Sequence, residues 1–249
     1  MYQAVHSTSA KVTYNQVDPS GRMRNISLMH MLEEAAIEHC DVIDRDVFTL
    51  LEEGFGWILL SGSLRFDHYP RYNDRINTDT WISHWRPHRG TREFLLKDDN
   101  TGRLVARAST QWAYVNAKER HITPVAKEFL ERWPVKTDRA VESQFIKRPL
   151  PLPPKYTTET FTVRRHDIDS NNHVHNGRFL EWVLETVPNN YFENRILTSL
   201  EGRFIHEARL HDRILVQAGE RADNELVHNV VRQSDGVVLS TGRSQWRFP

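Results

Sequence analysis

The sequence has 249 residues, 39% of them hydrophobic, which is enough for one large domain or two domains of ordinary size. Lysine plus arginine and aspartate plus glutamate each total 33, so no net field would attract nucleic acid or an anionic membrane. The single cysteine, Cys40, excludes an intrachain disulfide, and no apolar run has the length of a signal or a membrane span, so we expect a cytoplasmic protein without membrane insertion.

The first half of the sequence predicts one long helix between strands. Residues 11–17 alternate as in a strand, and residues 18–21 have the composition of a turn. Apolar residues from Leu28 onward recur at helical spacing, which predicts an amphipathic helix to about Ile43, capped by Asn25 or Ser27. Further strands are expected at these ranges: 57–66, 75–85, 91–97 and 104–115.

Two segments separate the halves of the sequence. Residues 124–133 predict a short helix, and the prolines of residues 149–154 predict an extended linker. We therefore expect a domain at residues 1–123, a linker at 124–156 and a second domain at 157–249.

Polar residues gather ahead of a helix in the second half. Asp169, Asn171 and His173 alternate, and in an extended chain their side chains would share one face. The following apolar stripe predicts a helix with Asn176 as its N-cap. The free N–H groups in the first turn of this helix could stabilise an oxyanion. The alternatives are a polar loop that only caps the helix, and a metal site, which the residue spacing does not favour.

An internal repeat supports a functional interpretation of this loop. Residues 168–176 align with residues 17–25 at an offset of 151, and residues 203–214 align with 65–76 at an offset of 138. Residues 243–246 also resemble 109–112. Each copy predicts an antiparallel sheet packed on one helix, an α+β class. The copies differ in their polar groups. Asn171 and His173 align with Ser20 and Arg22 of the first copy, and Glu207 aligns with Tyr69.

The motif Asp-x-Asn-x-His-Val-x-Asn before an amphipathic helix, with a glutamate on a later strand in a duplicated chain, resembles the acyl-acyl carrier protein thioesterases. The resemblance covers nearly the whole chain. It implies two tandem hot-dog domains, each a sheet wrapped around one helix, in a pseudo-dimer. It also implies hydrolysis of fatty acyl thioesters carried by acyl carrier protein, without cofactor or metal.

Carried over residue by residue, the resemblance assigns catalysis to Asp169, Asn171, His173 and Glu207. Plant members have a cysteine directly after the glutamate, whereas this sequence has Ala208 there. We therefore expect water activated by Glu207 and His173 to attack the thioester, with the choice of base left open. Asn171 would stabilise the oxyanion or orient the water, and Asp169 would hold the loop and the imidazole tautomer. The first domain would be catalytically silent and shape the substrate site.

Other residues receive weaker assignments. Met31, Trp57 and Leu59 are candidates for an acyl tunnel, although a tryptophan in a sheet is more often core. A basic cluster with Arg86, Arg89 and Arg92 could dock an acidic carrier or could be a solvated turn. Two further residues are expected to be structural: Cys40 in the core, and His175 as a solvated neighbour of the loop.

Three rival functions remain open at this point. A thioesterase of the same fold could act on acyl-coenzyme A, a hydratase could share the fold, and a non-catalytic module could bind acyl thioesters without turnover. Chain-length preference and oligomeric state, including a homodimer, are not decided by the sequence.

Overall fold

The structure is a computed structural model that describes residues 2–170 and 172–249. It divides into two compact units, which are described separately. Unit 1 comprises Met1–Leu60 and Leu64–Ser143, and unit 2 comprises Ser61–Ser63 and Gln144–Pro249. Among the described residues, no helix has the length and apolar composition needed to cross a membrane.

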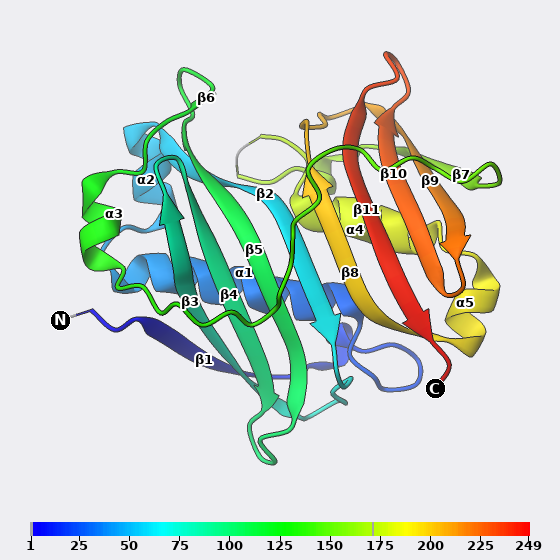
Figure 1. The fold of residues 1–249 in the computed structure, drawn as a ribbon, viewed down its shortest axis with the longest axis horizontal. Coiled ribbons are helices and arrows are strands. Elements are labelled where there is room, and N and C mark those ends of the chain that lie inside the picture. Colours follow the sequence, from blue (N-terminus) through cyan, green and yellow to red (C-terminus); the bar gives the residue numbers. More distant parts are fainter. Residues whose placement is uncertain (1, 171) are drawn as a thin grey trace. The chain divides into compact units, whose positions relative to one another are not determined.

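Unit 1 is a sheet with one long helix on one face (Figure 1). Its strand order is β1-β3-β4-β5-β2, and β6 pairs with β5. The pairings of β1 with β3, β3 with β4 and β4 with β5 are antiparallel. The elements are β1 (Val5–Lys11), α1 (Asn25–Val42), α2 (Val47–Glu53), β2 (Phe55–Phe66), β3 (Arg75–Arg86), β4 (Arg89–Asp98), β5 (Leu104–Asn116), β6 (His121–Ile122) and α3 (Lys127–Arg132).

Helix α1 is held on this sheet by one apolar stripe. Leu28, Leu32 and Ala35 recur at three- and four-residue spacing, and all are buried. Burying a side chain of leucine size contributes about 1.5–3 kcal/mol, so this stripe fixes the helix against β3 and the neighbouring strands. The end of the helix joins an aromatic core that includes Tyr114, Phe129 and Trp133.

Unit 2 repeats this arrangement with a shorter helix (Figure 1). Its strand order is β8-β11-β10-β9-β7, all of these pairings being antiparallel. Phe179, Trp182 and Val183 of the helix are buried against Val216 and Val230 of the sheet. The elements are β7 (Thr157–Thr162), α4 (Asn176–Glu185), α5 (Asn189–Asn194), β8 (Ile196–Phe204), β9 (Arg213–Ala222), β10 (Glu225–Arg232) and β11 (Val238–Arg247).

The predicted repeat is confirmed by hydrogen bonds at matching positions. The Asp18 amide donates to the Arg22 carbonyl at 2.8 Å, and the Asp169 amide donates to the His173 carbonyl at 2.9 Å. Near the end of each unit an indole N–H donates to the hydroxyl two residues earlier, at 2.9 Å in both Trp112 and Trp246. The two units therefore share main-chain geometry as well as strand order.

Several boundaries differ from the sequence-based expectation. The strand expected at residues 11–17 is wrong: β1 ends at Lys11, and residues 14–16 form a 3-10 turn because the Gln16 side chain accepts the Thr13 amide at 2.9 Å. Helix α1 begins at Asn25 with Arg24 as its N-cap, so neither expected cap was correct. Helix α2 was not expected, although Asp46 caps it and Gly54, with φ at 90°, ends it.

The segment expected as a linker is bound to both sheets. On unit 1, Arg139 Nε lies 2.6 Å from Glu93 Oε1, and the Ala140 amide donates to the same carboxylate at 3.1 Å. On unit 2, the Leu150 amide donates to Thr241 Oγ1 at 3.0 Å. The expected short helix occurs as α3, and residues 149–154 form no regular helix or strand.

Candidate functional site

The loop before α4 is a closed turn. The Asp169 amide donates to the His173 carbonyl, the Asn172 amide donates to the Asp169 carbonyl at 3.1 Å, and Asn172 adopts a φ of 63°. Ile168 and Val174 form an antiparallel bridge across the base of the turn. The expectation of an extended chain with alternating side chains was therefore wrong. Asp169 and His173 meet because the chain folds back between them.

Glu207 lies in the segment after β8, not on a strand as the sequence suggested. The Val174 amide donates to the Ala208 carbonyl at 2.9 Å, which joins this segment to the His173 loop. The Asp212 carboxylate accepts the Arg209 amide at 2.9 Å and stabilises the following turn. Val174 and Ala208, the residues that follow His173 and Glu207, are therefore in direct contact.

The His173 imidazole lies between two carboxylates. Its Nδ1 is 3.6 Å from Asp169 Oδ1, and its Nε2 is 3.9 Å from Glu207 Oε2. The side chains of His173 and Glu207 are 30% and 32% exposed, so water can reach them, while that of Asp169 is 18% exposed. Both distances exceed a direct hydrogen bond, which leaves room for a bridging water or for tightening around a substrate.

Arg209 holds the other oxygen of the glutamate. Its Nη2 donates to Glu207 Oε1 at 2.8 Å, and the Arg209 side chain is 62% exposed. The contact orients the carboxylate so that Oε2 faces His173. Arg209 was not identified from the sequence, because its position two residues after Glu207 gives no signal of its own.

The fourth predicted catalytic residue, Asn171, lies outside the described residues. Its assignment therefore rests on the sequence. The described part of the site consists of Asp169, His173 and Glu207, which the structure brings together.

The helix that follows begins differently from the prediction. Its N-cap is His175 and not Asn176, because His175 Nδ1 accepts the Gly177 amide at 3.1 Å. In a neutral imidazole this places the ring proton on Nε2. His175 is thus part of the helix start, a role that the expectation of a solvated neighbour missed.

The matching loop of unit 1 is closed by its own side chains. Tyr69 Oη donates to Asn25 Oδ1 at 2.6 Å, and burial raises the pKa of Tyr69 well above its usual value. Arg22 Nε donates to Ser20 Oγ at 3.0 Å. This loop therefore holds a neutral phenol and a guanidinium where unit 2 holds a carboxylate and an imidazole.

The three tunnel candidates lie in unit 1 in different settings. Met31 is buried on α1, and Leu59 is half-buried on β2. Trp57 packs against Phe129 and Trp133, with ring centroids 5.3 and 6.3 Å away, so it belongs to the aromatic core. Whether these residues contact an acyl chain stays a prediction.

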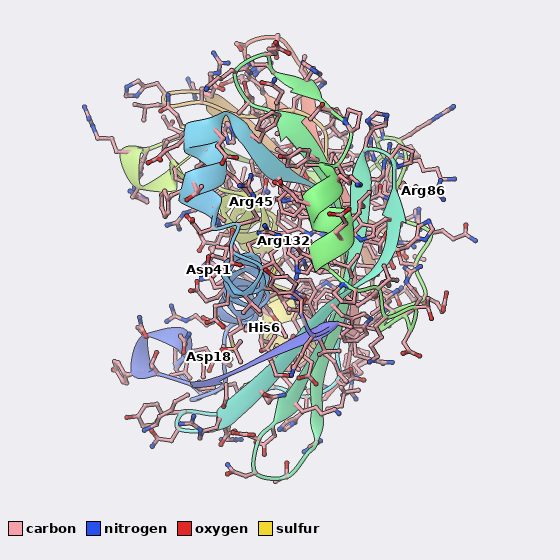
Figure 2. The ribbon with its side chains drawn as sticks, turned by 90° about the vertical axis from the view of Figure 1, so that its left-hand side faces the viewer. His6, Asp18, Asp41, Arg45, Arg86 and Arg132 are labelled. Carbon is pink, nitrogen blue, oxygen red and sulfur yellow. The ribbon has the colours of Figure 1, made fainter. Side chains whose placement is uncertain are left out.

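The docking cluster is divided by the structure. Arg92 is only 4% exposed and donates to His39 and Thr80, so its expected place on a docking surface was wrong. Its strand position explains this: Arg92, Phe94 and Leu96 alternate onto the face that packs against α1. Arg86 is exposed on the side of the sheet away from α1 (Figure 2), and Arg89 is half-buried and donates to Gln111 at 3.2 Å.

Cys40 is a buried core residue on α1, as expected. Burial raises the pKa of its thiol to about 11, so it is protonated at neutral pH and is a poor nucleophile. Within the described ranges, no group of three or more His, Cys, Asp or Glu side chains is arranged to hold a metal ion.

Comparison with known proteins identifies this fold and family. The structure superimposes on the 12:0-ACP thioesterase from Umbellularia californica with a TM-score of 0.88 and 20% identity, covering 100% of this chain and 99% of that one. An acyl-ACP thioesterase from Bacteroides thetaiotaomicron gives 0.86 and 20% identity, covering 98% of each chain. The protein thus has the α+β hot-dog fold.

Family models give the more specific assignment. Residues 3–133 match the acyl-ACP thioesterase N-terminal domain, and residues 152–248 match the C-terminal domain. The chain belongs to the acyl-ACP thioesterase family.

Curated relatives from plants are similar but longer. An acyl-[acyl-carrier-protein] hydrolase (FATB3, chloroplastic) of Cuphea viscosissima is 26% identical over 246 residues, which cover 89% of this chain and 57% of the relative. A dodecanoyl-[acyl-carrier-protein] hydrolase of Cinnamomum camphora is 24% identical over 253 residues, covering 93% of this chain and 65% of the relative. The chain therefore spans less than two thirds of the length of these plant proteins.

Proposed function

We propose that this protein hydrolyses fatty acyl-acyl carrier protein thioesters to a free fatty acid and the carrier thiol. The observation that carries the proposal is the His173 imidazole between Asp169 and Glu207 in a chain of this family. Both His173 and Glu207 are partly exposed, as groups that receive a water molecule must be.

In the proposed mechanism, a water molecule lies between His173 Nε2 and Glu207 Oε2. One of these groups takes a proton as the water oxygen attacks the carbonyl carbon of the thioester. The carbonyl π electrons move to oxygen, and the Asn171 side chain stabilises the resulting oxyanion. When the carbonyl re-forms, the carbon–sulfur bond breaks, and the proton taken from water passes to the leaving thiolate.

The supporting residues set this geometry. Asp169 is near Nδ1 of His173 and favours the tautomer that leaves Nε2 available to the water. Arg209 fixes Oε1 of Glu207, and the proposed water lies beside Oε2. Unit 1 lacks these groups, so we assign it to substrate shaping, with Met31, Trp57 and Leu59 as tunnel candidates and Arg86 and Arg89 as carrier contacts.

The test is thiol release from acyl carrier protein thioesters of several chain lengths, beside the coenzyme A esters. Loss of a positioned acid–base group removes about 10² to 10⁴ in rate, so His173→Ala and Glu207→Gln should each fall by that factor. Their double variant should be little worse than either one, because they act on one water molecule.

Cys40→Ser is the matched control and should stay within about threefold of the parent, since this buried thiol lies outside the proposed site. A fully active Glu207→Gln would remove Glu207 from the mechanism. Detection of acyl groups covalently bound to Cys40 would indicate a cysteine nucleophile and contradict the proposed attack by water. Binding of acyl thioesters without turnover would indicate a non-catalytic module.

A further inference from the structure

Unit 1 buries a cation, Arg92, for which the described residues offer no anionic partner. Arg92 is 4% exposed, and its Nη1 donates to the neutral groups His39 Nδ1 at 3.1 Å and Thr80 Oγ1 at 3.2 Å. Its Cζ lies 4.9 Å from the centre of the Trp133 ring. Among the described residues no carboxylate forms an ion pair with it. Burial lowers the pKa of Arg92 only to about 10, so the side chain is charged at neutral pH. A buried charge without a counterion is costly.

The hydrogen bond from Arg92 fixes the tautomer of His39. A guanidinium can only donate, so His39 Nδ1 accepts and carries no proton. Burial lowers the pKa of His39 to about 2, which keeps the ring neutral and places its proton on Nε2. That buried Nε2–H has no acceptor among the described residues.

Three indoles add further donors beside His39 and Arg92. The Nε1 atoms of Trp57, Trp85 and Trp133 are all buried and lack an acceptor in the described part of the chain. The Trp85 ring centroid is 5.9 Å from those of both Trp57 and Trp133, and His39 is 5.3 Å from Trp133. We call these five side chains the donor cluster. Unsatisfied buried groups are rare in proteins, and here each is an N–H donor.

Unit 2 indicates that the fold does not need this cation. Arg92 pairs with Thr110 across the β4–β5 ladder, and at the matching place in unit 2 Leu226 pairs with Ser244. By the same register, Ala218 occupies the place of Thr80. An apolar pair thus fills these positions in the other copy. The guanidinium of Arg92 and the hydroxyl of Thr80 are thus specific to unit 1 at these matched positions.

One side of the donor cluster approaches solvent. His6 of β1 stacks on His39 with ring centroids 5.6 Å apart, and its side chain is 17% exposed. Figure 2 shows His6 beside α1, on the helix side of the sheet. Apolar neighbours of the cluster include Ile82 and Phe129.

We propose that the donor cluster binds the carboxylate of a fatty acid, whose chain packs on the surrounding aromatic side chains. A carboxylate supplies the negative charge and the acceptors that this cluster lacks. The apolar surroundings favour an aliphatic chain over a strongly hydrated inorganic anion. The inference rests on the proposed function in one respect, because a fatty acid is the product of that reaction. The site would let the product bind within unit 1, whereas His173 and Glu207 belong to unit 2.

The experiment measures equilibrium binding by calorimetry, with dodecanoate below its micelle concentration and dodecanol as the uncharged comparison. Arg92→Leu, which introduces the residue found at the matching position of unit 2, should weaken dodecanoate binding roughly 10- to 100-fold, as expected for a lost charged hydrogen bond. Arg92→Lys should weaken dodecanoate binding less than Arg92→Leu does. Dodecanol should bind more weakly than dodecanoate to the parent and be insensitive to Arg92→Leu.

Matched tryptophan variants keep the test independent of the stability of Arg92→Leu. Trp133→Phe removes an N–H without an acceptor and should weaken dodecanoate binding about threefold or more. Trp81→Phe should not, because the Trp81 indole already donates to the Asp138 carbonyl at 2.9 Å. Equal dodecanoate affinity in folded Arg92→Leu and the parent, or equal binding of dodecanol, would overturn the proposal.

Glu207→Gln separates this inference from the proposed function. It should bind dodecanoate as the parent does while hydrolysis falls. If Glu207→Gln loses dodecanoate binding and Arg92→Leu keeps it, the product binds at the hydrolytic site and the donor cluster has no such role. Because dodecanoate binding is measured without turnover, it tests the donor cluster even if the protein does not hydrolyse the thioester.

Discussion

The two loops at residues 17–23 and 168–174 share a backbone and differ in chemistry. In both, an aspartate begins the turn, and its side chain accepts the amide four residues later, at 3.1 Å for Arg22 and 3.4 Å for His173. The residue before that amide has positive φ, 75° at Gly21 and 63° at Asn172. The loop geometry is therefore set by features common to both copies. The remaining side chains differ between the copies although the turn is the same.

This comparison gives the aspartates a testable division of roles. Asp18 and Asp169 both stabilise the turn, but only Asp169 has an imidazole beside it. Asp169→Asn should lower the hydrolysis rate by roughly tenfold to 10², about 1.4–2.7 kcal/mol of barrier, because it removes the negative charge beside His173 Nδ1. Asp18→Asn should leave the rate within about threefold. Equal losses in rate for both variants would assign Asp169 to loop structure alone.

The sheets differ at a further matched core position, besides that of Arg92 and Leu226. His228 in unit 2 occupies the place of Phe94 in unit 1, by the same strand register. Burial lowers the pKa of His228 to about 3 from 6.5, so between these values the unfolded chain binds the extra proton. The free energy of unfolding should therefore fall as pH drops from 6.5, by about 1.4 kcal/mol per pH unit for this group.

His228→Phe should make that dependence shallower by the same amount. The measurement is denaturant unfolding at pH 6.5 and pH 5, with the parent as reference. The acid dependence due to His39, whose pKa burial also lowers, should remain. If the free energy of unfolding changes equally between pH 6.5 and pH 5 in His228→Phe and in the parent, His228 does not contribute to the pH dependence.

A smaller effect is expected at the surface of unit 1. Arg86→Glu and Arg89→Glu should raise the Michaelis constant for a carrier protein thioester about threefold to fivefold, because exposed charge contacts contribute up to about 1 kcal/mol. The constant for the coenzyme A ester should change less, and added salt should reduce the difference. Equal effects on both substrates would place carrier docking elsewhere.

Much of the fold could be predicted because the repeat and the apolar periodicities are local signals. The offset between Asp18 and Asp169 locates both loops, and the stripe from Leu28 locates α1. The closed turn at Asp169 could not be derived from alternation, since it depends on Asn172 adopting positive φ and on main-chain bonds. The position of Glu207 after β8 likewise depends on where a strand ends, which periodicity defines poorly.

The burial of Arg92 could have been inferred from the sequence of β4. Arg92 shares one face of β4 with the buried apolar residues Phe94 and Leu96, because alternate residues of a strand lie on the same face. Grouping Arg92 with Arg86 and Arg89 by charge ignored that alternation. The matching residue Leu226 in the second copy would have indicated a core position.

We propose that unit 2 carries the hydrolytic residues and that unit 1 does not. This proposal is tested most directly by single-turnover thiol release from one acyl carrier protein thioester, comparing Arg22→Ala/Tyr69→Phe with Glu207→Gln. We expect the unit 1 variant, once shown to be folded, to release thiol within about threefold of the parent, and Glu207→Gln to be slower by about 10² to 10⁴. Loss of thiol release in the unit 1 variant with retention in Glu207→Gln would contradict the account.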